Sequence, residues 1–224
     1  MESAIGVMKT SSGSMFPDHP YEETIDDIVG VGGVLETEML VDAYSRGIFP
    51  WPQVEYPMLW FFPAQRGVLD FSELHIPRSL EKFIRHHGQE FQFTVNKSFA
   101  QVIENCRIQK RPNQDGTWIL PEIKRAYLQF HLDGYAHSVE CWRGNTLVGG
   151  IYGVLMNGVF SGESMFHLEE NTSKLSLLHL IHWLKNKGLT WMDIQMLTPV
   201  TESLGGKYIS GKEFFYRLPF SKTI

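Results

Sequence analysis

Two polar side chains, Asp193 and Gln195, stand two residues apart near the end of the chain. The surrounding segment alternates like a strand, in which every second side chain points to the same face. A carboxylate and an amide would then project side by side, with Met192 and Met196 on the opposite, apolar face. A solvated sheet face fits the same pattern, but Trp191 on the polar face favours partial enclosure. We therefore take Asp193 and Gln195 as candidate catalytic residues.

A second carboxylate, Glu163, lies in the alternating segment 160–166, where Ser161 shares its face. Between them, Gly162 permits another backbone or a ligand to approach closely. A hydrogen-bonded position at a sheet edge would use the same residue types. We assign Glu163 to substrate binding.

Three tryptophans, Trp51, Trp60 and Trp118, lie on segments flanked by proline or glycine. Core packing is the usual role of tryptophan. Tryptophans on loops near a basic segment also stack on unpaired bases, which contributes about 1 to 3 kcal/mol per base. Both interpretations stay open from the sequence alone.

Charge is distributed unevenly along this chain of net charge −5. Residues 1–60 carry ten acids and two bases, whereas the remaining 164 residues sum to +3. Within a predicted helix, Arg78, Lys82 and Arg85 stand at spacings that place them on one face. Such a face binds phosphate or is merely solvated, and we expect it to contact phosphate groups.

Familiar catalytic motifs are missing: the chain has no GxSxG, HExxH, phosphate-binding P-loop or GxGxxG. Its two cysteines, Cys106 and Cys141, form no CxxC pair, so neither a disulfide framework nor a cysteine zinc site is expected. His179 and His182 share a helix face, which surface exposure explains as well as a metal does. We expect no metal and no cofactor.

No apolar run approaches the roughly 18 residues that span a bilayer. The first residues also lack the basic and apolar blocks of a signal peptide. We therefore expect a cytoplasmic protein with no membrane partner.

The composition, 43% hydrophobic and 20% charged over 224 residues, is typical of a globular protein with a sizeable core. A short amphipathic helix is expected from Thr37 to Gly47. Aromatic residues between prolines then indicate a loop over 49–63, because proline disfavours helix interiors and central strands. We place a boundary near Ala64, which gives a small N-terminal domain (1–64) and a larger domain (65–224).

The larger part has the pattern of an α+β core, in which helices cover an antiparallel or mixed sheet. Two-residue turns at Gly144-Asn145 and Asn157-Gly158 join three strands into a meander. We expect helices at 77–87, 98–107, 121–134 and 173–187 and strands at 91–95, 136–143, 146–155, 159–166 and 190–197.

Many collinear segments between about residue 30 and residue 215 resemble the leucyl/phenylalanyl-tRNA–protein transferase family. The matching segments are Tyr44-Ser-Arg-Gly-Ile-Phe-Pro-Trp51, Leu59-Trp60, Arg66-Gly-Val-Leu, His75-Ile-Pro-Arg78-Ser, Gly116-Thr-Trp-Ile119, Ala136-His-Ser-Val-Glu140, Leu147-Val-Gly-Gly-Ile-Tyr-Gly153, Phe160-Ser-Gly-Glu-Ser-Met-Phe166, Asn171 to Lys174, Asp193-Ile-Gln195 and Ser203-Leu-Gly205.

This resemblance implies a GNAT-like acyltransferase core, preceded by a small N-terminal domain. The implied reaction moves Leu or Phe, and less readily Met, from aminoacyl-tRNA to proteins that begin with Arg or Lys, and so creates an N-terminal degradation signal. Trp51 and Trp118 match tryptophans that hold the terminal adenosine. The enzyme is expected to act as a monomer. The further substrate-binding positions expected here are Tyr127 and the apolar pocket residues Ile151, Phe160, Leu180 and Leu184.

The chain departs from the family pattern at several positions. Leucines stand at 180 and 184, where the family commonly has aromatic residues, and Val200 replaces a histidine. The segment 209–211 replaces an Ile-Pro-Arg run. The change at 180 and 184 leaves the preference between Phe and Leu open.

Accounts of the family give Gln195 the role of a base, with Asp193 as a relay. A neutral amide has no useful proton affinity near pH 7, so we interpret Gln195 as a residue that orients the amine or the ester. Asp193 then provides electrostatic support or pairs with the cation of the acceptor.

Two alternatives come from other functional classes. A noncatalytic module that binds RNA 3′ ends would need the tryptophans but not Asp193. An acetyl-coenzyme A enzyme would need a glycine loop for pyrophosphate, which is not evident.

Overall fold

The computed structural model describes residues 14–53, 56–110 and 116–219. They form two compact units: the first contains the described residues up to Arg66 and those from Ile209 onward, and the second runs from Gly67 to Tyr208. The division into 1–64 and 65–224 stays a prediction. The start of the chain, on which the signal-peptide expectation rests, lies outside the described residues.

The first unit holds a three-stranded antiparallel sheet in the order β1-β3-β2. Trp60, in the central strand, is fully buried and donates a hydrogen bond from Nε1 to the carbonyl oxygen of Gly32 (2.9 Å). Core packing is therefore its role. The elements of this unit are β1 (Ile28–Val31), α1 (Thr37–Ser45), β2 (Phe49–Pro50), β3 (Leu59–Phe61) and, from the end of the chain, α7 (Gly211–Arg217).

The loop predicted over 49–63 is wrong in part, because the segment contributes both β2 and β3. Proline is excluded only where it would remove a ladder hydrogen bond. Pro50 lies on the edge strand β2, and Pro57 and Pro63 lie outside β3, so the prolines do not interrupt the central strand.

The second unit is built on a seven-stranded sheet in the order β10-β4-β9-β8-β7-β6-β5. Strands β5 to β8 pair antiparallel, β4 pairs antiparallel with β9, and β8 pairs parallel with β9. This mixed sheet confirms the expected α+β class. The strands are β4 (Gln65–Asp70), β5 (Gln92–Val95), β6 (Ala136–Arg143), β7 (Thr146–Met156), β8 (Val159–His167), β9 (Trp191–Gln195) and β10 (Lys207–Ser210).

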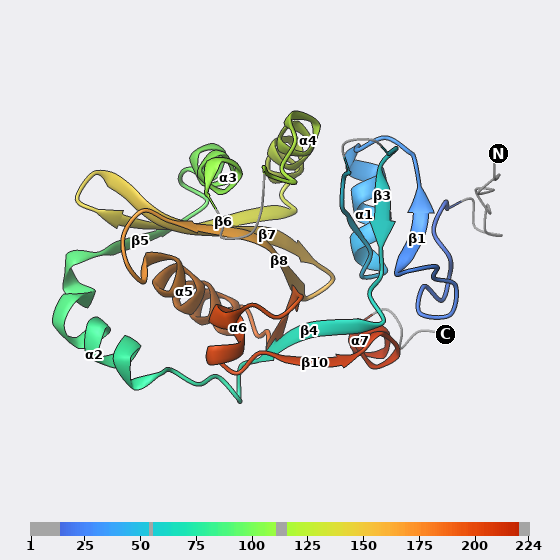
Figure 1. Cartoon of the computed structure of the whole chain (residues 1–224). Coiled ribbons are helices and arrows are strands. Elements are labelled where there is room, and N and C mark those ends of the chain that lie inside the picture. Colours follow the sequence, from blue (N-terminus) through green and yellow to red (C-terminus); the bar gives the residue numbers. More distant parts are fainter. Residues whose placement is uncertain (1–13, 54–55, 111–115, 220–224) are drawn as a thin grey trace. The chain divides into compact units, whose positions relative to one another are not determined.

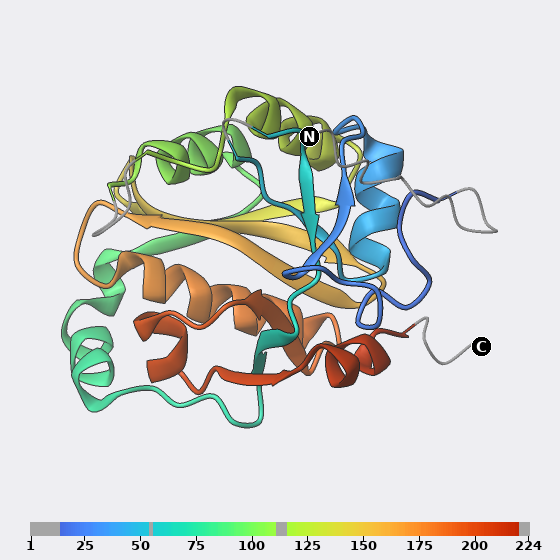
Figure 2. The same ribbon diagram turned by 45° about the vertical axis from the view of Figure 1, so that its right-hand side comes forward.

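Helices cover both faces of this sheet: α3 and α4 lie on one face, and α5 and α6 lie on the other (Figures 1 and 2). The four predicted helices are found with ends within two residues of those expected. The helices are α2 (Arg78–His87), α3 (Phe99–Ile108), α4 (Pro121–Leu132), α5 (Thr172–Asn186) and α6 (Pro199–Ser203), with a 3-10 turn at Gly88–Glu90.

Helix α5 comes unusually close to β7. A Cβ atom at Gly149 would lie 2.7 Å from the Cβ of Thr172, so only glycine allows this approach. The Thr172 hydroxyl donates a hydrogen bond to the carbonyl oxygen of Val148 (2.8 Å) and fixes the start of the helix. The first turn of α5 is thereby held close to β7.

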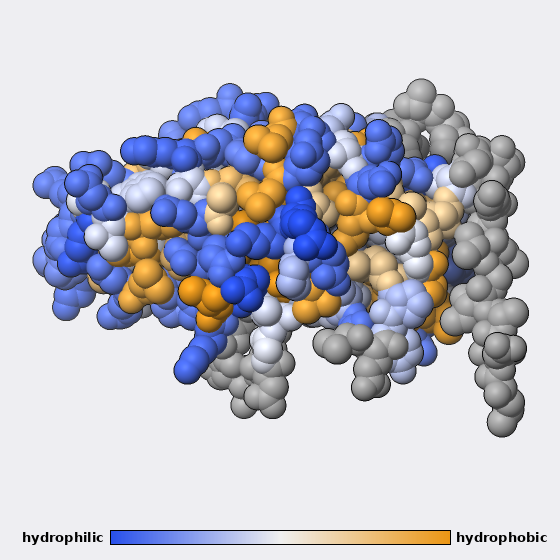
Figure 3. All heavy atoms as spheres, turned by 90° about the horizontal axis from the view of Figure 1, so that it is seen from above, coloured by the Kyte–Doolittle hydropathy of each residue, from blue (hydrophilic) through white to orange (hydrophobic). Residues whose placement is uncertain are grey.

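On the opposite face, an ion-pair network links α3 to α4. Glu104 accepts hydrogen bonds from Arg107 (2.6 Å) and from Lys124 (2.7 Å). These hydrogen bonds lower the pKa of the Glu104 carboxyl to about 2. Figure 3, which views this side of the sheet, shows hydrophilic and hydrophobic residues interspersed over it. Arg107 and Lys124 are thus paired with Glu104 within the protein.

We predict that Glu104→Gln lowers the free energy of unfolding near pH 7 by about 1 kcal/mol or less, because the network is partly exposed. A carboxyl whose pKa is lowered by folding stabilises the native state above its ordinary pKa and loses that effect as the pH falls toward 2. Denaturant unfolding between pH 7 and pH 2 measures this. The difference from the wild type should shrink below about pH 4.5. A difference that stays constant with pH, or an equal effect of the control Glu122→Gln, would contradict the prediction.

Candidate active site

The parallel strands β8 and β9 pair at one register position in the described part of the chain, between Ser161 and Asp193. Two residues further along each strand, the strands are joined by a hydrogen bond between side chains. There the Gln195 amide nitrogen Nε2 donates a hydrogen bond to Glu163 Oε1 (2.9 Å). The structure therefore brings the two polar segments singled out in the sequence into one group.

The backbone of Gln195 adopts a left-handed conformation, with φ of 58°. This conformation is unfavourable for a residue with a side chain. Its N–H donates to Asp193 Oδ1 (2.8 Å), so the carboxylate of Asp193 stabilises the turn. Asp193 is fully buried and Gln195 is 5% exposed, which contradicts the interpretation as a solvated sheet face.

The turn at Gln195 also corrects the expected strand alternation. Met192 is buried as predicted, but Met196 is 45% exposed instead of lying on the apolar face. The alternation fails because a left-handed residue redirects the chain at the end of β9.

Gly67 is a site residue that the sequence analysis missed. It pairs with Gln195 across β4 and β9, next to an irregularity in the register. A Cβ atom at Gly67 would lie 3.0 Å from the backbone carbonyl carbon of Met196. Its place in the segment Arg66-Gly-Val-Leu was the only signal that could have pointed to it.

Tyr127 reaches the same group from α4. Its ring is fully buried, and its hydroxyl donates to Glu163 Oε2 over a long 3.4 Å. Glu163 thus accepts from Tyr127 through one oxygen and from Gln195 through the other. We call the four residues Tyr127, Glu163, Gln195 and Asp193 the polar chain.

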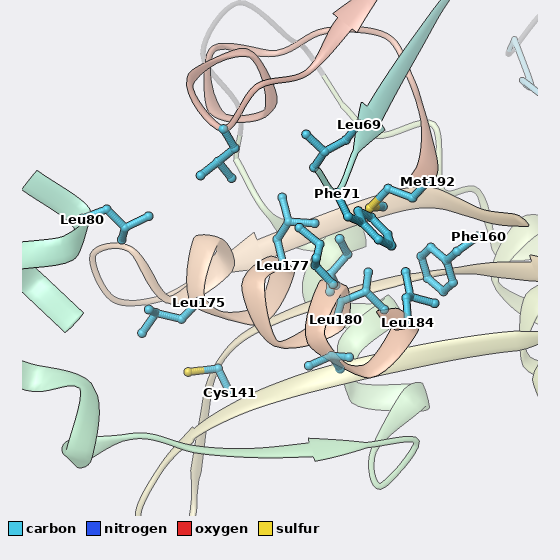
Figure 4. Packing of buried hydrophobic residues seen from close by; sticks show 14 of the residues in the cluster. Leu69, Phe71, Leu80, Cys141, Phe160, Leu175, Leu177, Leu180, Leu184 and Met192 are labelled. Carbon is cyan, nitrogen blue, oxygen red and sulfur yellow. The ribbon is translucent and has the colours of Figure 1, made fainter. Parts of the chain in front are cut away.

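The four expected pocket residues belong to one buried hydrophobic cluster, between α5 and the sheet. Phe160, Leu180 and Leu184 lie close together beside Met192 in Figure 4. Phe160 directly precedes Ser161, and Met192 directly precedes Asp193, so the cluster begins one residue away from the pairing of β8 with β9. The fourth member is Ile151 on β7.

Trp51 and Trp118 are both half-buried, in contrast to the fully buried Trp60. Trp51 lies in the first unit and Trp118 in the second. Next to Trp118, the backbone turns tightly, with the Leu120 N–H donating to the Trp118 carbonyl oxygen (2.9 Å). Both residues therefore keep some exposed surface, which stacking on a base requires.

The three basic residues Arg78, Lys82 and Arg85 are all exposed along helix α2. Their placement fits the expected basic face. Arg111, another base in the positively charged part of the chain after residue 60, lies outside the described residues.

Among residues 14–53, 56–110 and 116–219, no group of three or more His, Cys, Asp or Glu residues is arranged to hold a metal ion. Both cysteines are buried, and burial raises the pKa of the Cys141 thiol to about 12, which disfavours a thiolate nucleophile. Within the same ranges, no helix is both long and apolar enough to cross a membrane.

Two family models match the chain: "Leucyl/phenylalanyl-tRNA protein transferase" over residues 68–219 and the N-terminal domain of the same family over residues 33–64. A relative of that name from Maridesulfovibrio salexigens is 43% identical over 89% of this chain and 82% of its own length. Another, from Pseudoalteromonas translucida, is 41% identical over 86% of this chain and 80% of its own.

Two solved structures are similar at a lower level. L-PGS from Bacillus licheniformis has a TM-score of 0.43 and 16% identity, over 73% of this chain and 51% of that one. A GCN5-related N-acetyltransferase-like protein from Streptococcus suis has a TM-score of 0.39 and 14% identity, over 78% of this chain and 64% of that one.

We predict that Gln195→Gly unfolds at higher denaturant concentration than Gln195→Ala. Both variants lose the amide contact with Glu163, but only Ala retains the cost of the left-handed conformation, about 1 to 2 kcal/mol. Denaturant unfolding of the two variants gives the difference directly. Equal stabilities, or a more stable Ala variant, would show that the left-handed turn is not retained.

Proposed function

The chain belongs to the leucyl/phenylalanyl-tRNA protein transferase family, and from that premise we propose that it transfers Leu, Phe and, less readily, Met from aminoacyl-tRNA to the N-terminal Arg or Lys of acceptor proteins. The product is a protein with a new N-terminal residue that marks it for degradation. We further propose that the enzyme acts as a monomer in the cytoplasm and needs no cofactor.

The reaction mainly requires that the ester and the amine be held in position. The aminoacyl ester is already activated, and an α-amino group with a pKa of about 7.7 to 8.0 is partly unprotonated near neutral pH. The amine attacks the ester carbonyl, a C–N bond forms, the ester C–O bond breaks, and the 3′ hydroxyl of the tRNA leaves with a proton. Holding ester and amine together supplies roughly 7 to 11 kcal/mol, so neither a serine nor a cysteine nucleophile is required.

The observation that carries the proposal is the hydrogen bond between Gln195 and Glu163. Because a carboxylate only accepts hydrogen bonds, the Gln195 nitrogen must face Glu163 and its oxygen Oε1 must point the other way. That oxygen is suited to accept a hydrogen bond from the attacking amine. Gln195 then orients the nucleophile, while the Glu163 carboxylate attracts the cationic side chain of the N-terminal Arg or Lys of the acceptor.

Asp193 has a supporting role in this proposal. It is fully buried and its Oδ1 accepts the backbone N–H of Gln195, so it holds the turn that aims the amide. This geometry favours electrostatic and conformational support over direct contact with the acceptor. Tyr127 supports Glu163 in the same way from α4.

The remaining residues bind the two ends of the aminoacyl-tRNA. We propose that Trp51 and Trp118 stack on the terminal adenosine, and that Ile151, Phe160, Leu180 and Leu184 receive the apolar side chain of the amino acid. An apolar pocket rejects polar side chains because nothing in it satisfies them. A module that only bound RNA 3′ ends would have no use for the polar chain, so we favour the transferase.

We predict that Asp193→Asn and Gln195→Ala lower the single-turnover rate by about 100-fold or more. The reason is that a misplacement of the reactants by about 1 Å can lower the reaction rate about 100-fold. Affinity for aminoacyl-tRNA should change by no more than a few fold. The assay follows radiolabelled Leu from tRNA to a protein with N-terminal Arg, with a protein beginning with Ser as the control acceptor. Rates near the wild type in both variants would remove these residues from the site.

Trp51→Ala and Trp118→Ala should each weaken binding of aminoacyl-tRNA by about 1 to 3 kcal/mol, the scale of stacking on one base. Equilibrium binding to Leu-tRNA, alongside thermal unfolding, separates affinity from stability. Unchanged affinity combined with a lower unfolding temperature would mean that the rings serve packing instead.

Replacing Arg78, Lys82 and Arg85 together by Ala should weaken the binding of all tRNAs alike, because phosphate contacts carry no sequence information. The slope of log affinity against log salt concentration should also become flatter, since fewer counterions are released on binding. Binding of two different aminoacyl-tRNAs at several salt concentrations measures both effects. A slope equal to that of the wild type would show that this helix face is only solvated.

A further inference from the structure

Arg66 is an arginine buried in the first unit, with 1% of its surface exposed. Its guanidinium carbon Cζ lies 4.7 Å from the ring centroid of Phe49 and 4.4 Å from that of Phe214. Arginine is rarely so enclosed, because taking its charge out of water is costly. Aromatic faces offset part of that cost through cation–π attraction. The two rings therefore fix the position of the guanidinium, and the guanidinium fixes theirs.

The ring of Phe49 also contacts Trp51. Their ring centroids are 6.4 Å apart at an interplanar angle of 71°, an edge-to-face contact. The two residues flank Pro50, whose ring restricts φ. The Trp51 N–H donates to the Leu59 carbonyl oxygen (2.8 Å), so the backbone is held as well. Contacts thus run without interruption from Arg66 through the buried Phe49 to the half-buried indole of Trp51.

On its other side, Arg66 meets the last helix of the described chain. Phe214, on α7, is 1% exposed and packs against Gly47, where a Cβ atom would lie 2.5 Å from its ring. The helix is also held at its start, since the Gly211 N–H donates to the Ala64 carbonyl oxygen (2.8 Å). Arg66 is therefore clamped from both sides by elements of the first unit.

We propose that Arg66 is a positioning residue for Trp51, and through it for the terminal base of the tRNA. The inference rests on the proposed function, in which Trp51 stacks on that base. The guanidinium lies over the rings of Phe49 and Phe214 at once, so it sets where the Phe49 ring lies. The Phe49 ring in turn supports the indole edge, which leaves the indole oriented before tRNA arrives. Preorganisation of this kind raises affinity because less freedom is lost on binding.

The test is Arg66→Met, which keeps much of the side-chain volume and removes the charge. Affinity for Leu-tRNA should fall about 3- to 10-fold, the scale of a cation–π contact. The KM for Leu-tRNA should rise in step, while kcat and the KM for the acceptor protein stay within about twofold. Arg66→Lys should restore part of the affinity. Arg217→Met is the matched control and should bind like the wild type, because Arg217 lies on α7, the helix of Phe214, and pairs with Glu213.

A double-mutant cycle with Trp51→Ala distinguishes this role from others. If Arg66 acts through Trp51, then Arg66→Met adds little to the loss already caused by Trp51→Ala. Loss factors that multiply, or a lower kcat, would overturn the inference, because Arg66 would then act elsewhere, for instance through its neighbour Gly67. All measurements are made at a temperature where each variant is folded.

Two further outcomes are informative. If Trp51→Ala leaves the affinity unchanged, the proposed stacking role of Trp51 fails and this inference fails with it. If Trp51→Ala weakens binding but folded Arg66→Met does not, the stacking role stands and only the role of Arg66 is overturned. Should Arg66→Met not fold, Phe214→Leu removes one of the two rings and should give the same pattern with a smaller factor.

Discussion

One hydrogen bond, from the Gln195 amide to the Glu163 carboxylate, joins β8 and β9 two residues beyond the register pair of Ser161 with Asp193. Because the contact is made by side chains, it requires an amide at 195 and a carboxylate at 163 and sets the direction of both. A hydrogen bond between the backbones of the two strands would not do so. The carboxylate dictates which end of the amide faces outward. The proposed orientation of the attacking amine depends on that choice.

The surrounding structure serves to hold this contact. Asp193 accepts a hydrogen bond from the backbone N–H of Gln195 and stabilises a left-handed turn. Gly67 has no side chain, which allows the backbone of Met196 to pass close to it after this turn. Tyr127 holds the second oxygen of Glu163 from α4, which the Glu104 network ties to α3. The apolar cluster around Leu184 begins one residue before the pairing of Ser161 with Asp193. A reaction that needs positioning more than acid–base strength is consistent with a site in which every polar group is held by another.

Much of the second unit could be predicted from the sequence, because its signals are local. Glycine and asparagine at 144–145 and 157–158 specify two turns, and helix periodicity gave four helices nearly to the residue. The site itself depends on contacts between distant residues, such as Tyr127 and Glu163, 36 positions apart. No local pattern reveals a left-handed Gln195 or the place of Gly67 beside it. The exposure of Met196 was misjudged for that reason, and β2 and β3 were missed because proline rules depend on which strand is at the edge.

The coupling between Glu163 and Gln195 in the chemical step tests the central claim most directly. Single-turnover transfer at saturating Leu-tRNA and acceptor would be measured for Glu163→Ala, for Gln195→Ala and for the double variant. If the two side chains act as one unit, the double variant should be about as slow as the slower single variant. Rate losses that multiply would show two independent contributions and would contradict the account.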